Sequence, residues 1–314
     1  THRTAMTGNG ARRARAMLGA RCVLDAPLGA HTTYRVGGRA GAWFVVEDED
    51  DMRHVARAVE AAAVDVLVLG KGSNLLVADV GFPGLVLTLG DAFAGVEIRV
   101  DGTVRAGGRT DLPVLARQTA AEGWRGMEWA VGVPGSVGGG VRMNAGGHGS
   151  DMAERLERVR IFDVATGQDR SVSAADLDLG YRRSNIGPSQ VVAWAEFSVV
   201  QGDPEQAGAE VSDIVRWRRL HQPGGQNAGS IFTNPPGDSA GRLVEVAGCK
   251  GLRLGTAEVS TKHANFIQSA PGGSADDVLA LIKEVRRRVR AETGVDLVPE
   301  VRLVGFSPST EEPS

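Results

Sequence analysis

The sequence has few of the residues that mark several common classes of protein. Only two of its 314 residues are cysteines, Cys22 and Cys249, and their separation matches no CxxC or other metal-ligand spacing. This excludes a disulfide framework, and we expect a reducing compartment. The six histidines include no HExxH pair, which leaves a metal site without support.

Excess positive charge and long apolar runs are also missing. The formal net charge is −3, so there is no overall positive field to attract nucleic acid or an anionic membrane. No run approaches the ~20 apolar residues of a membrane span, and no signal-peptide core follows the arginine-rich start. We therefore expect a cytoplasmic protein with no nucleic-acid or membrane partner and with a loose N-terminal tail; the sequence leaves open whether its first ~25 residues are ordered.

Glycine, in contrast, is abundant. The chain contains 43 glycines, about twice the average usage of ~7%. Twelve of them cluster in four stretches that read GKGSN, VPGSVGGG, NAGGHG and QPGGQNAGS. Such clusters either form tight turns or let main-chain amides approach a ligand closely.

The hydrophobic periodicity predicts a mixed α+β fold. Strands at 42–47 and 64–69 enclose a helix at 50–63, which is typical of a βαβ unit. Short strands, a helix at 111–122 and a glycine-rich region at 132–149 that leads to a short helix follow, and this order does not suit a doubly wound sheet. We place a domain boundary at QGDPEQ (201–206), before an amphipathic helix at 207–220, and expect a last helix at 274–294.

The glycine clusters carry two candidate binding sites. GKGSNL (70–75) lacks the third glycine and the following helix of a dinucleotide fingerprint, but its amides, with Lys71 and Ser73, suit a diphosphate. The stretch from Val131 to Gly147, with Asn144, is either a wall for an extended cofactor or a long surface loop.

Charged residues mark four further segments, each with a functional and a purely structural interpretation. Arg182 in YRRS suits the capture of a carboxylate, and Arg218 and Arg219 in WRRLHQP suit phosphates, but surface arginines look the same in sequence. His263 in VSTKHANFI is catalytic or structural, and Glu300 in PEVR is a carboxylate oriented by a preceding proline.

Seven motifs, taken in order, resemble those of one family. TTYRVGG, GKGSNLLV, VPGSVGG…MNAG, YRRS, AGSIFTNP, VSTKHANFI and PEVRLVG match the UDP-N-acetylenolpyruvoylglucosamine reductase family, also called UDP-N-acetylmuramate dehydrogenases. The match runs from about residue 30 to the end of the sequence. Because the chain lacks the longer insertions of one branch, it resembles the shorter, second type of this flavoprotein family.

The resemblance implies a fold and a reaction. The fold has two FAD-binding lobes, as in the vanillyl-alcohol oxidase group, at 1–92 and 93–204, and an α+β substrate domain at 205–314 whose last strand returns to the first lobe or stays with the substrate domain. In the implied reaction, NADPH reduces FAD, and the flavin passes hydride to UDP-N-acetylglucosamine-enolpyruvate, which gives UDP-N-acetylmuramate of the bacterial cell wall.

The resemblance also implies residue roles. Ser230 matches the family's proton donor, and a weakly acidic serine suits this role because hydride addition leaves a strongly basic carbanion or enolate. Arg182 would stabilise the enolate, and Glu300 would act protonated or share a proton with the substrate carboxylate. The implied FAD contacts are Gly37, Lys71, Gly72, Ser73, Asn74, Gly135, Ser136, Gly138, Asn144 and Gly146. The implied substrate contacts are Arg218, Arg219, Asn234, Lys262 and His263.

Two departures and two alternatives accompany the resemblance. Thr233 stands where the family usually has lysine, and Ile186 stands where it has phenylalanine, which puts substrate contacts in doubt more than the chemistry. The alternatives are a flavin-dependent oxidase of the same fold, with His148 as the candidate for a covalent flavin bond, and a non-catalytic sugar-nucleotide-binding homologue.

Overall fold

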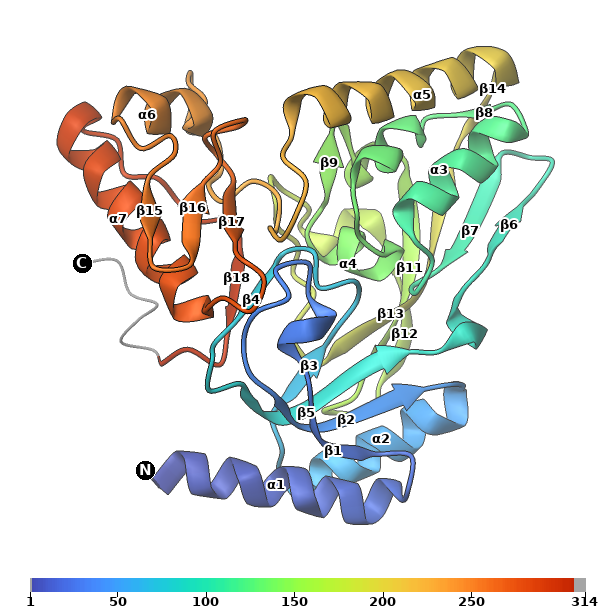
Figure 1. The fold of residues 1–314 in the computed structure, drawn as a ribbon. Coiled ribbons are helices and arrows are strands. Elements are labelled where there is room, and N and C mark those ends of the chain that lie inside the picture. The colour runs from blue at the N-terminus through green and yellow to red at the C-terminus, as the bar shows by residue number, and fades with distance from the viewer. Residues whose placement is uncertain (1, 308–314) are drawn as a thin grey trace. The chain divides into compact units, whose positions relative to one another are not determined.

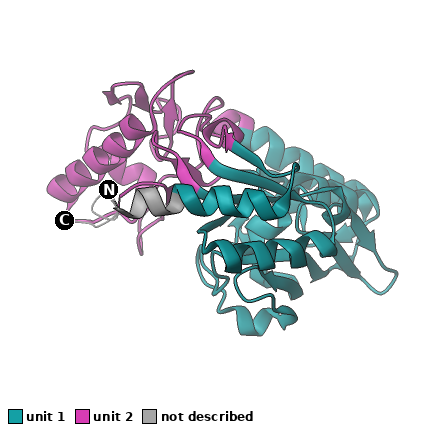
Figure 2. Cartoon of the chain, turned by 90° about the horizontal axis from the view of Figure 1, so that it is seen from below, with its two compact units in different colours: residues 1–24, 41–71, 84–218 teal, residues 25–40, 72–83, 219–314 magenta. Residues whose placement is uncertain are grey.

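A computed structural model describes residues 2–307 of the chain, with side chains from residue 8 (Figure 1). The chain divides into two compact units, which Figure 2 colours separately. Unit 1 comprises residues 1–24, 41–71 and 84–218, and unit 2 comprises residues 25–40, 72–83 and 219–314. Each unit combines helices with β-sheet, as the periodicity predicted.

The chain begins with a helix, so the expected loose tail is wrong for the described residues. Helix α1 (His2–Leu18) contacts α2 (Glu49–Ala62) in unit 1. Ala11, Ala14 and Leu18 recur at helical spacing and are buried in the core. Arginines surround this narrow apolar stripe in the sequence, which is why composition alone suggested a tail.

The first sheet has the strand order β1-β2-β5-β3. Its strands are β1 (Val23–Ala26), β2 (Ala40–Val46), β5 (Phe82–Leu89) and β3 (Val66–Val68). The predicted βαβ unit is present as β2-α2-β3, with β5 between the two strands and parallel to β3. Helix α2 starts where the Asp48 side chain accepts a hydrogen bond from the Asp51 amide, and it ends at left-handed Ala63.

A five-stranded antiparallel sheet forms the other layer of unit 1, in the order β12-β11-β13-β7-β6. The strands are β6 (Val96–Ile98), β7 (Thr103–Gly107), β11 (Leu156–Asp163), β12 (Asp169–Ser173) and β13 (Gln190–Ser198). Its inner residues form one core with three helices, α3 (Leu112–Ala121), α4 (Val137–Arg142) and α5 (Pro204–His221).

Helix α4 lies inside the glycine-rich segment at 132–149, for which a cofactor wall and a surface loop were the two interpretations. Three consecutive glycines disfavour a helix in isolation, but close packing offsets this cost. The Gly138 amide donates to the carbonyl of Gly108 at 2.8 Å, and a Cβ on Gly140 would lie 2.5 Å from the Met152 side chain. Ser136 caps the helix by accepting a hydrogen bond from Gly139.

Unit 2 contains α6 (Ala240–Val246) and α7 (Ala275–Thr293), with α7 in contact with a three-stranded antiparallel sheet. The sheet consists of β15 (Arg253–Leu254), β16 (Ala257–Val259) and β17 (Ile267–Ser269). Ser274 caps the start of α7, and left-handed Gly294 follows its end, as expected from the sequence. The last strand, β18 (Arg302–Val304), pairs in parallel with β4 (Leu75–Val77).

The remaining elements are short strand pairs and 3-10 turns. Two small antiparallel pairs are β8 (Trp124–Arg125) with β14 (Val200–Gln201), and β9 (Gly146–Gly147) with β10 (Ser150–Asp151). Single 3-10 turns occur at η1 (Gly29–His31), η2 (Asp91–Phe93), η3 (Glu128–Gly132), η4 (Met152–Glu154) and η5 (Ala174–Leu177). Within residues 2–307, no helix has the length and apolar character to cross a bilayer.

The division into units differs from the three consecutive segments expected from the sequence. Helix α5 was assigned to the C-terminal domain, but Ala207, Val211 and Ile214 are buried in the core of unit 1. Residues 25–40 and 72–83, which lie early in the chain, belong to unit 2. A local composition shift at 201–206 cannot reveal these long-range contacts.

Candidate functional site

The predicted site residues fall in both units, and we describe each unit by itself. In unit 1, the glycine wall (residues 131–147) is tied to the YRRS motif and to the preceding Gly180 by three hydrogen bonds. Ser184 Oγ donates to the carbonyl of Arg142 at 2.6 Å, Asn144 Nδ2 to that of Gly180 at 3.0 Å, and Arg182 Nη2 to that of Gly146 at 2.9 Å. The structure therefore brings together two motifs that are separate in the sequence.

Two predicted residues of this region have a left-handed backbone. Asn144 has φ 40° and Arg182 has φ 57°. Asparagine tolerates this conformation, and Asn144 is only 3% exposed, with Oδ1 accepting from Ala153 N and Nδ2 also donating to Asp151. Arginine has no such local compensation, and backbone strain of this kind gathers at functional sites. The conformation of Arg182 thus marks it as a candidate functional residue.

The main-chain amides of the glycine wall have acceptors within unit 1. Gly135 N donates to Val133 O, Val137 N to Thr110 O, and Gly138 N to Gly108 O, all at 2.8 Å. These N–H groups are therefore already used within the protein, and the wall would contact a cofactor mainly through its shape.

The GKGSN segment is different, because its amides are available. Among residues 2–307, the main-chain N–H groups of Gly70, Lys71, Gly72 and Ser73 have no hydrogen-bond acceptor. Lys71 Nζ forms an ion pair with Asp111 at 2.7 Å. Successive unused amides next to a hydroxyl and an ammonium group suit a diphosphate, so this donor set fits the phosphates of FAD.

In unit 2, the loop that carries Ser230 is joined to the segment that carries Glu300. Glu300 N donates to the carbonyl of Ile231 at 2.7 Å, and Ile231 N donates to the carbonyl of Asn265 at 2.9 Å. Ser230 therefore precedes a residue that is hydrogen-bonded on both sides. Upstream, Gly229 has φ 77° and donates to Asn227 Oδ1 at 3.0 Å, which forms a tight turn.

Two residues predicted to contact FAD have structural roles in unit 2. Asn74 Nδ2 donates to the carbonyl of Glu300 at 3.1 Å, and Arg302 N donates to the carbonyl of Asn74 at 3.0 Å. Gly37 has φ 103°, and a Cβ there would overlap the Val77 carbonyl, so no other residue fits without a backbone shift.

The predicted substrate residues of unit 2 also have internal partners. Lys262 Nζ donates to the carbonyl of Arg219 at 2.6 Å, and Asn234 Oδ1 accepts from Ala240 N at the start of α6. His263 is half-buried, burial lowers the pKa of its imidazole, and Nδ1 accepts from the amide of Asn265. These contacts orient the side chains, and their role toward a substrate stays a prediction.

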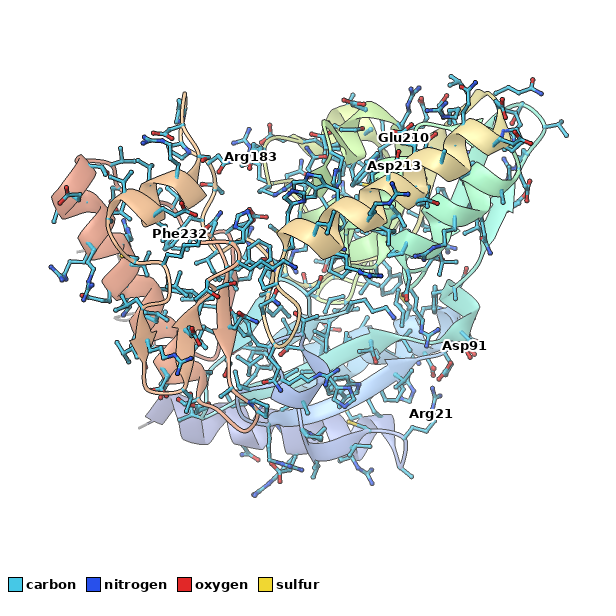
Figure 3. All side chains as sticks on the ribbon, turned by 45° about the horizontal axis from the view of Figure 1, so that its top comes forward. Arg21, Asp91, Arg183, Glu210, Asp213 and Phe232 are labelled. Carbon is cyan, nitrogen blue, oxygen red and sulfur yellow. The ribbon has the colours of Figure 1, made fainter. Side chains whose placement is uncertain are left out.

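Arg218 is half-buried in unit 1 near the end of α5, and this burial lowers the pKa of its guanidinium. The two departures from the family pattern are local: Ile186 packs into the core of unit 1, and Thr233 Oγ1 donates to the carbonyl of Val298 at 3.3 Å. Arg183, next to Arg182, is exposed (Figure 3). It forms an ion pair with Asp178.

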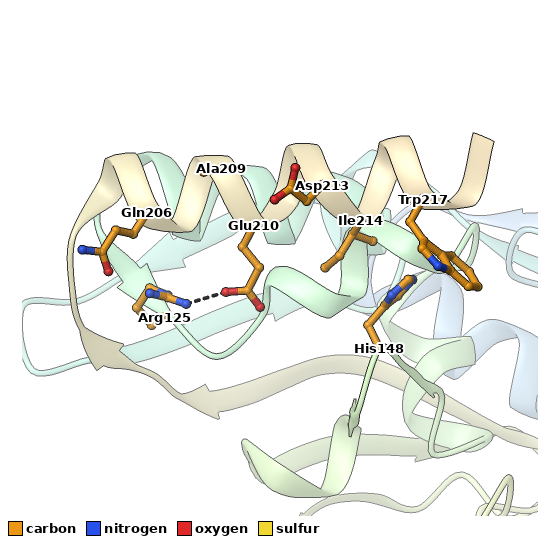
Figure 4. Close-up of a pocket in the computed structure, with 8 residues that line it drawn as sticks. All are labelled: Arg125, His148, Gln206, Ala209, Glu210, Asp213, Ile214 and Trp217. Carbon is orange, nitrogen blue, oxygen red and sulfur yellow. Dashed lines mark hydrogen bonds and ion pairs between the residues drawn. The ribbon is translucent and has the colours of Figure 1, made fainter. Parts of the chain in front are cut away.

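Unit 1 also contains a pocket of about 580 Å³ along α5 (Figure 4). His148 and Trp217 line one end, with ring centroids 5.1 Å apart and an edge-to-face geometry. Burial, with a smaller effect from Arg218, lowers the pKa of His148. Of the candidate site residues named from the sequence, His148 alone is among the described residues that line this pocket. Its imidazole packs against Trp217.

No three His, Cys, Asp or Glu side chains converge as metal ligands anywhere in the described part of the chain. Sequence reasoning missed one polar residue in unit 2. Asn265 was quoted within VSTKHANFI without a role, but its side chain bonds to the main chain of Phe232, two residues after Ser230. An asparagine between apolar residues in a loop was the available signal.

Comparison with known families defines the class of protein first. The sequence model of the FAD binding domain family matches residues 40–173. This range includes the GKGSN segment, the glycine wall and the strands β2, β3 and β5 of the first sheet. A berberine-bridge-enzyme-like protein of Physcomitrella patens shares the fold at 13% identity, with a TM-score of 0.55 over 90% of this chain and 89% of that one. The chain is thus an FAD-binding protein of the oxidoreductase fold predicted from the sequence.

The C-terminal part and the relatives define the family. The model of the UDP-N-acetylenolpyruvoylglucosamine reductase C-terminal domain matches residues 220–304. The chain is 41% identical to UDP-N-acetylenolpyruvoylglucosamine reductase 2 of Symbiobacterium thermophilum over 285 residues, which cover 90% of this chain and 92% of the relative. It is also 41% identical to the reductase of Heliobacterium modesticaldum over 284 residues, 90% of each chain.

A solved structure agrees with these relatives. The crystal structure of the reductase from Thermus caldophilus matches with a TM-score of 0.77 and 35% identity, over 90% of this chain and 98% of that one. The chain belongs to the UDP-N-acetylenolpyruvoylglucosamine reductase family and is an oxidoreductase. The resemblance carried by the seven motifs is therefore confirmed.

Proposed function

We propose that this chain reduces UDP-N-acetylglucosamine-enolpyruvate to UDP-N-acetylmuramate for peptidoglycan precursor synthesis, with FAD as cofactor and NADPH as electron donor. Relatives named for this reductase activity support the proposal at 41% identity. The observation that carries it is the pairing of the Ser230 loop with the Glu300 segment through Ile231. A weak acid and a carboxyl group on adjacent segments suit protonation next to a carboxylate.

The chemistry divides between the cofactor and the protein. When bound, FAD takes two electrons from NADPH and supplies them as hydride to the methylene carbon of the enolpyruvyl group. The π electrons of the substrate's C=C bond then move to the neighbouring carbon, which bears the carboxylate, and this carbon becomes strongly basic. The Ser230 hydroxyl donates its proton to that carbon, which completes the second new C–H bond, and the serine recovers a proton from solvent.

Two further residues act on the substrate carboxylate. The Arg182 guanidinium donates hydrogen bonds to the carboxylate oxygens as negative charge grows on them, and a donor that is already oriented contributes most. Its contact with the Gly146 carbonyl supplies this orientation. Glu300 works protonated or shares a proton with the substrate, because two ionised carboxylates would repel each other.

The binding residues follow the predicted sets. We assign the FAD phosphates to the amides and side chains of Lys71, Gly72 and Ser73, because their N–H groups are unused within the described chain. We assign Gly135, Ser136, Gly138, Asn144 and Gly146 of the wall to the same cofactor, together with Gly37 and Asn74 of unit 2. We assign the UDP-sugar to Arg218, Arg219, Asn234, Lys262 and His263.

The test separates the two half-reactions. Purified protein should be yellow, should be bleached by NADPH without oxygen, and should regain its colour when the enolpyruvyl substrate is added. Ser230→Ala should keep the NADPH step and lose the substrate step, whereas the surface control Ser212→Ala should keep both. Colourless protein that takes up no FAD, or equal loss of both steps in Ser230→Ala, would overturn the proposal.

A further inference from the structure

The side chain of Asn265 acts as a strand partner for the residues after Ser230. It is 4% exposed, Oδ1 accepts from Phe232 N at 3.0 Å, and Nδ2 donates to Phe232 O at 2.8 Å. A side-chain amide has the same donor and acceptor as a peptide group, so it can replace both. The Asn265 carbonyl also accepts from Ile231 N at 2.9 Å. One residue therefore holds three successive main-chain groups of the loop.

The opposite edge of the loop is held by the Glu300 segment. Glu300 N donates to Ile231 O at 2.7 Å, Thr233 N donates to Val298 O at 2.9 Å, and Phe232 forms an isolated antiparallel bridge with Pro299. Residues 231–233 thus form a short middle strand between Asn265 and residues 298–300. We call this arrangement the Ser230 ladder.

The main chain of Asn265 is itself held by His263. The backbone N–H of Asn265 donates to His263 Nδ1 at 3.2 Å, and the His263 ring lies edge-on against the Phe266 ring, with centroids 4.8 Å apart. Burial lowers the pKa of this imidazole, which favours the neutral form in which Nδ1 accepts a hydrogen bond. Ile231 and Phe232 are 0% and 2% exposed, so water does not replace a lost ladder bond easily.

The upstream side of Ser230 is anchored farther away along the chain. Gln226 O accepts a hydrogen bond from Ser269 N at 3.0 Å, and Ala228 is buried in the core of unit 2. Next to Ser230, Gly229 N donates to Asn227 Oδ1 within the same turn. On the downstream side, the residue that directly follows Ser230 is already bonded on both edges, so the ladder holds Ser230 from its nearest neighbour and beside the Glu300 segment.

We infer that Asn265 is a positioning residue for proton transfer by Ser230: its side-chain amide fixes the strand that starts at Ile231 and so aims the hydroxyl. The inference rests on the proposed function of Ser230. It adds a residue that touches neither cofactor nor substrate and acts through the main chain of Phe232.

The test uses the full-length flavoprotein and two variants. Asn265→Asp keeps the size of the side chain but places an oxygen against the Phe232 carbonyl, and Asn265→Ala removes both bonds. In each, reoxidation of the reduced flavin by the enolpyruvyl substrate should slow by about 10²-fold, the usual cost of a small displacement of a reacting group. Reduction by NADPH and the affinity of the oxidised enzyme for substrate should not change.

Two further measurements separate positioning from loss of stability. Ser274→Ala removes the cap of α7 and weakens unit 2 without touching the ladder, so it should lower the melting temperature but leave reoxidation unchanged. In a Ser230→Ala background, Asn265→Asp should cause no further loss, because its effect passes through the serine hydroxyl. The solvent deuterium isotope effect on reoxidation should also rise in Asn265→Asp.

Three outcomes would overturn the inference. These are normal reoxidation in both Asn265 variants, equal slowing in Ser274→Ala at a matched melting temperature, and additive losses in the double variant. Failure of the proposed function would look different, because the wild-type protein itself would then not be reoxidised by the enolpyruvyl substrate.

Discussion

The glycine wall of unit 1 and the Ser230 ladder of unit 2 keep their shapes by different means. The wall is held by main-chain hydrogen bonds such as that from Gly138 N to Gly108 O, by close packing at its glycines and by left-handed residues such as Asn144. The ladder is held on one edge by Asn265, through its side-chain amide and its carbonyl, and on the other edge by the Glu300 segment. The wall should therefore be sensitive to added side-chain atoms, and the ladder to lost hydrogen bonds.

The largest effect is expected at Arg182, which is hydrogen-bonded to the wall. Arg182→Gln removes the guanidinium that bonds to the Gly146 carbonyl, and we expect reoxidation by the enolpyruvyl substrate to fall by about 10²–10³-fold, as for the loss of one oriented donor. Reduction by NADPH should stay near the wild-type rate. Rapid-mixing absorbance of the flavin measures both steps, and an equal fall in both would argue for a binding role instead.

An intermediate effect is expected when an atom is added to the wall. A Cβ on Gly146 would lie 2.5 Å from Asp151 Cβ, so Gly146→Ala forces a local shift. We expect a loss of about 1–3 kcal/mol in the free energy of unfolding and a lower flavin content. Gly147→Ala is the matched control, because its Cβ would meet no atom within 4 Å. If both variants behaved alike, close packing would not be what shapes the wall.

The smallest effect is expected at a buried carboxylate outside both regions. Glu196 is 3% exposed, and Arg105 donates to it at 2.6 Å with Arg158 on its other oxygen. Burial raises the pKa of this carboxyl, but the hydrogen bonds from Arg158 and Arg105 outweigh burial, so its pKa lies below the usual value. The stabilisation is therefore present above about pH 4.3, the usual pKa of glutamate, and is lost as pH falls below it.

Glu196→Gln should remove this dependence. We expect the variant to be about 1 kcal/mol less stable than the wild type at neutral pH, with the difference shrinking as the solution is acidified. Urea unfolding at pH 7 and pH 4 measures this. Flavin content and both half-reactions should stay unchanged at pH 7, and a change in either would show that the network reaches the wall or the ladder.

The sequence predicted the elements whose causes are local. Ser274 and Gly294 delimit α7 in the sequence as they do in the structure, and the βαβ pattern near the start was correct. The family resemblance and its candidate residues came from ordered short motifs. In contrast, the glycines of α4 are explained only by Gly108 and Met152, which lie far from them in the sequence.

The ladder shows the same limit. Asn265 and Phe232 are separated by 33 positions, and no spacing rule links an asparagine in one loop to the main chain of another. The assignment of residues 25–40 and 72–83 to unit 2 is likewise a long-range property. Local patterns identified the chemical groups, and only the three-dimensional contacts reveal how they are held.

The parallel pairing of β4 with β18 has a consequence for biosynthesis. The Asn74 side chain bonds to the Glu300 carbonyl across 226 positions of chain, so unit 2 cannot close until nearly all of the polypeptide has left the ribosome. Residues 72–83 are made early and must wait for a strand near residue 303. During that interval the edge of β4 is open to other chains, and a nascent protein cut short before β18 would expose the same edge permanently.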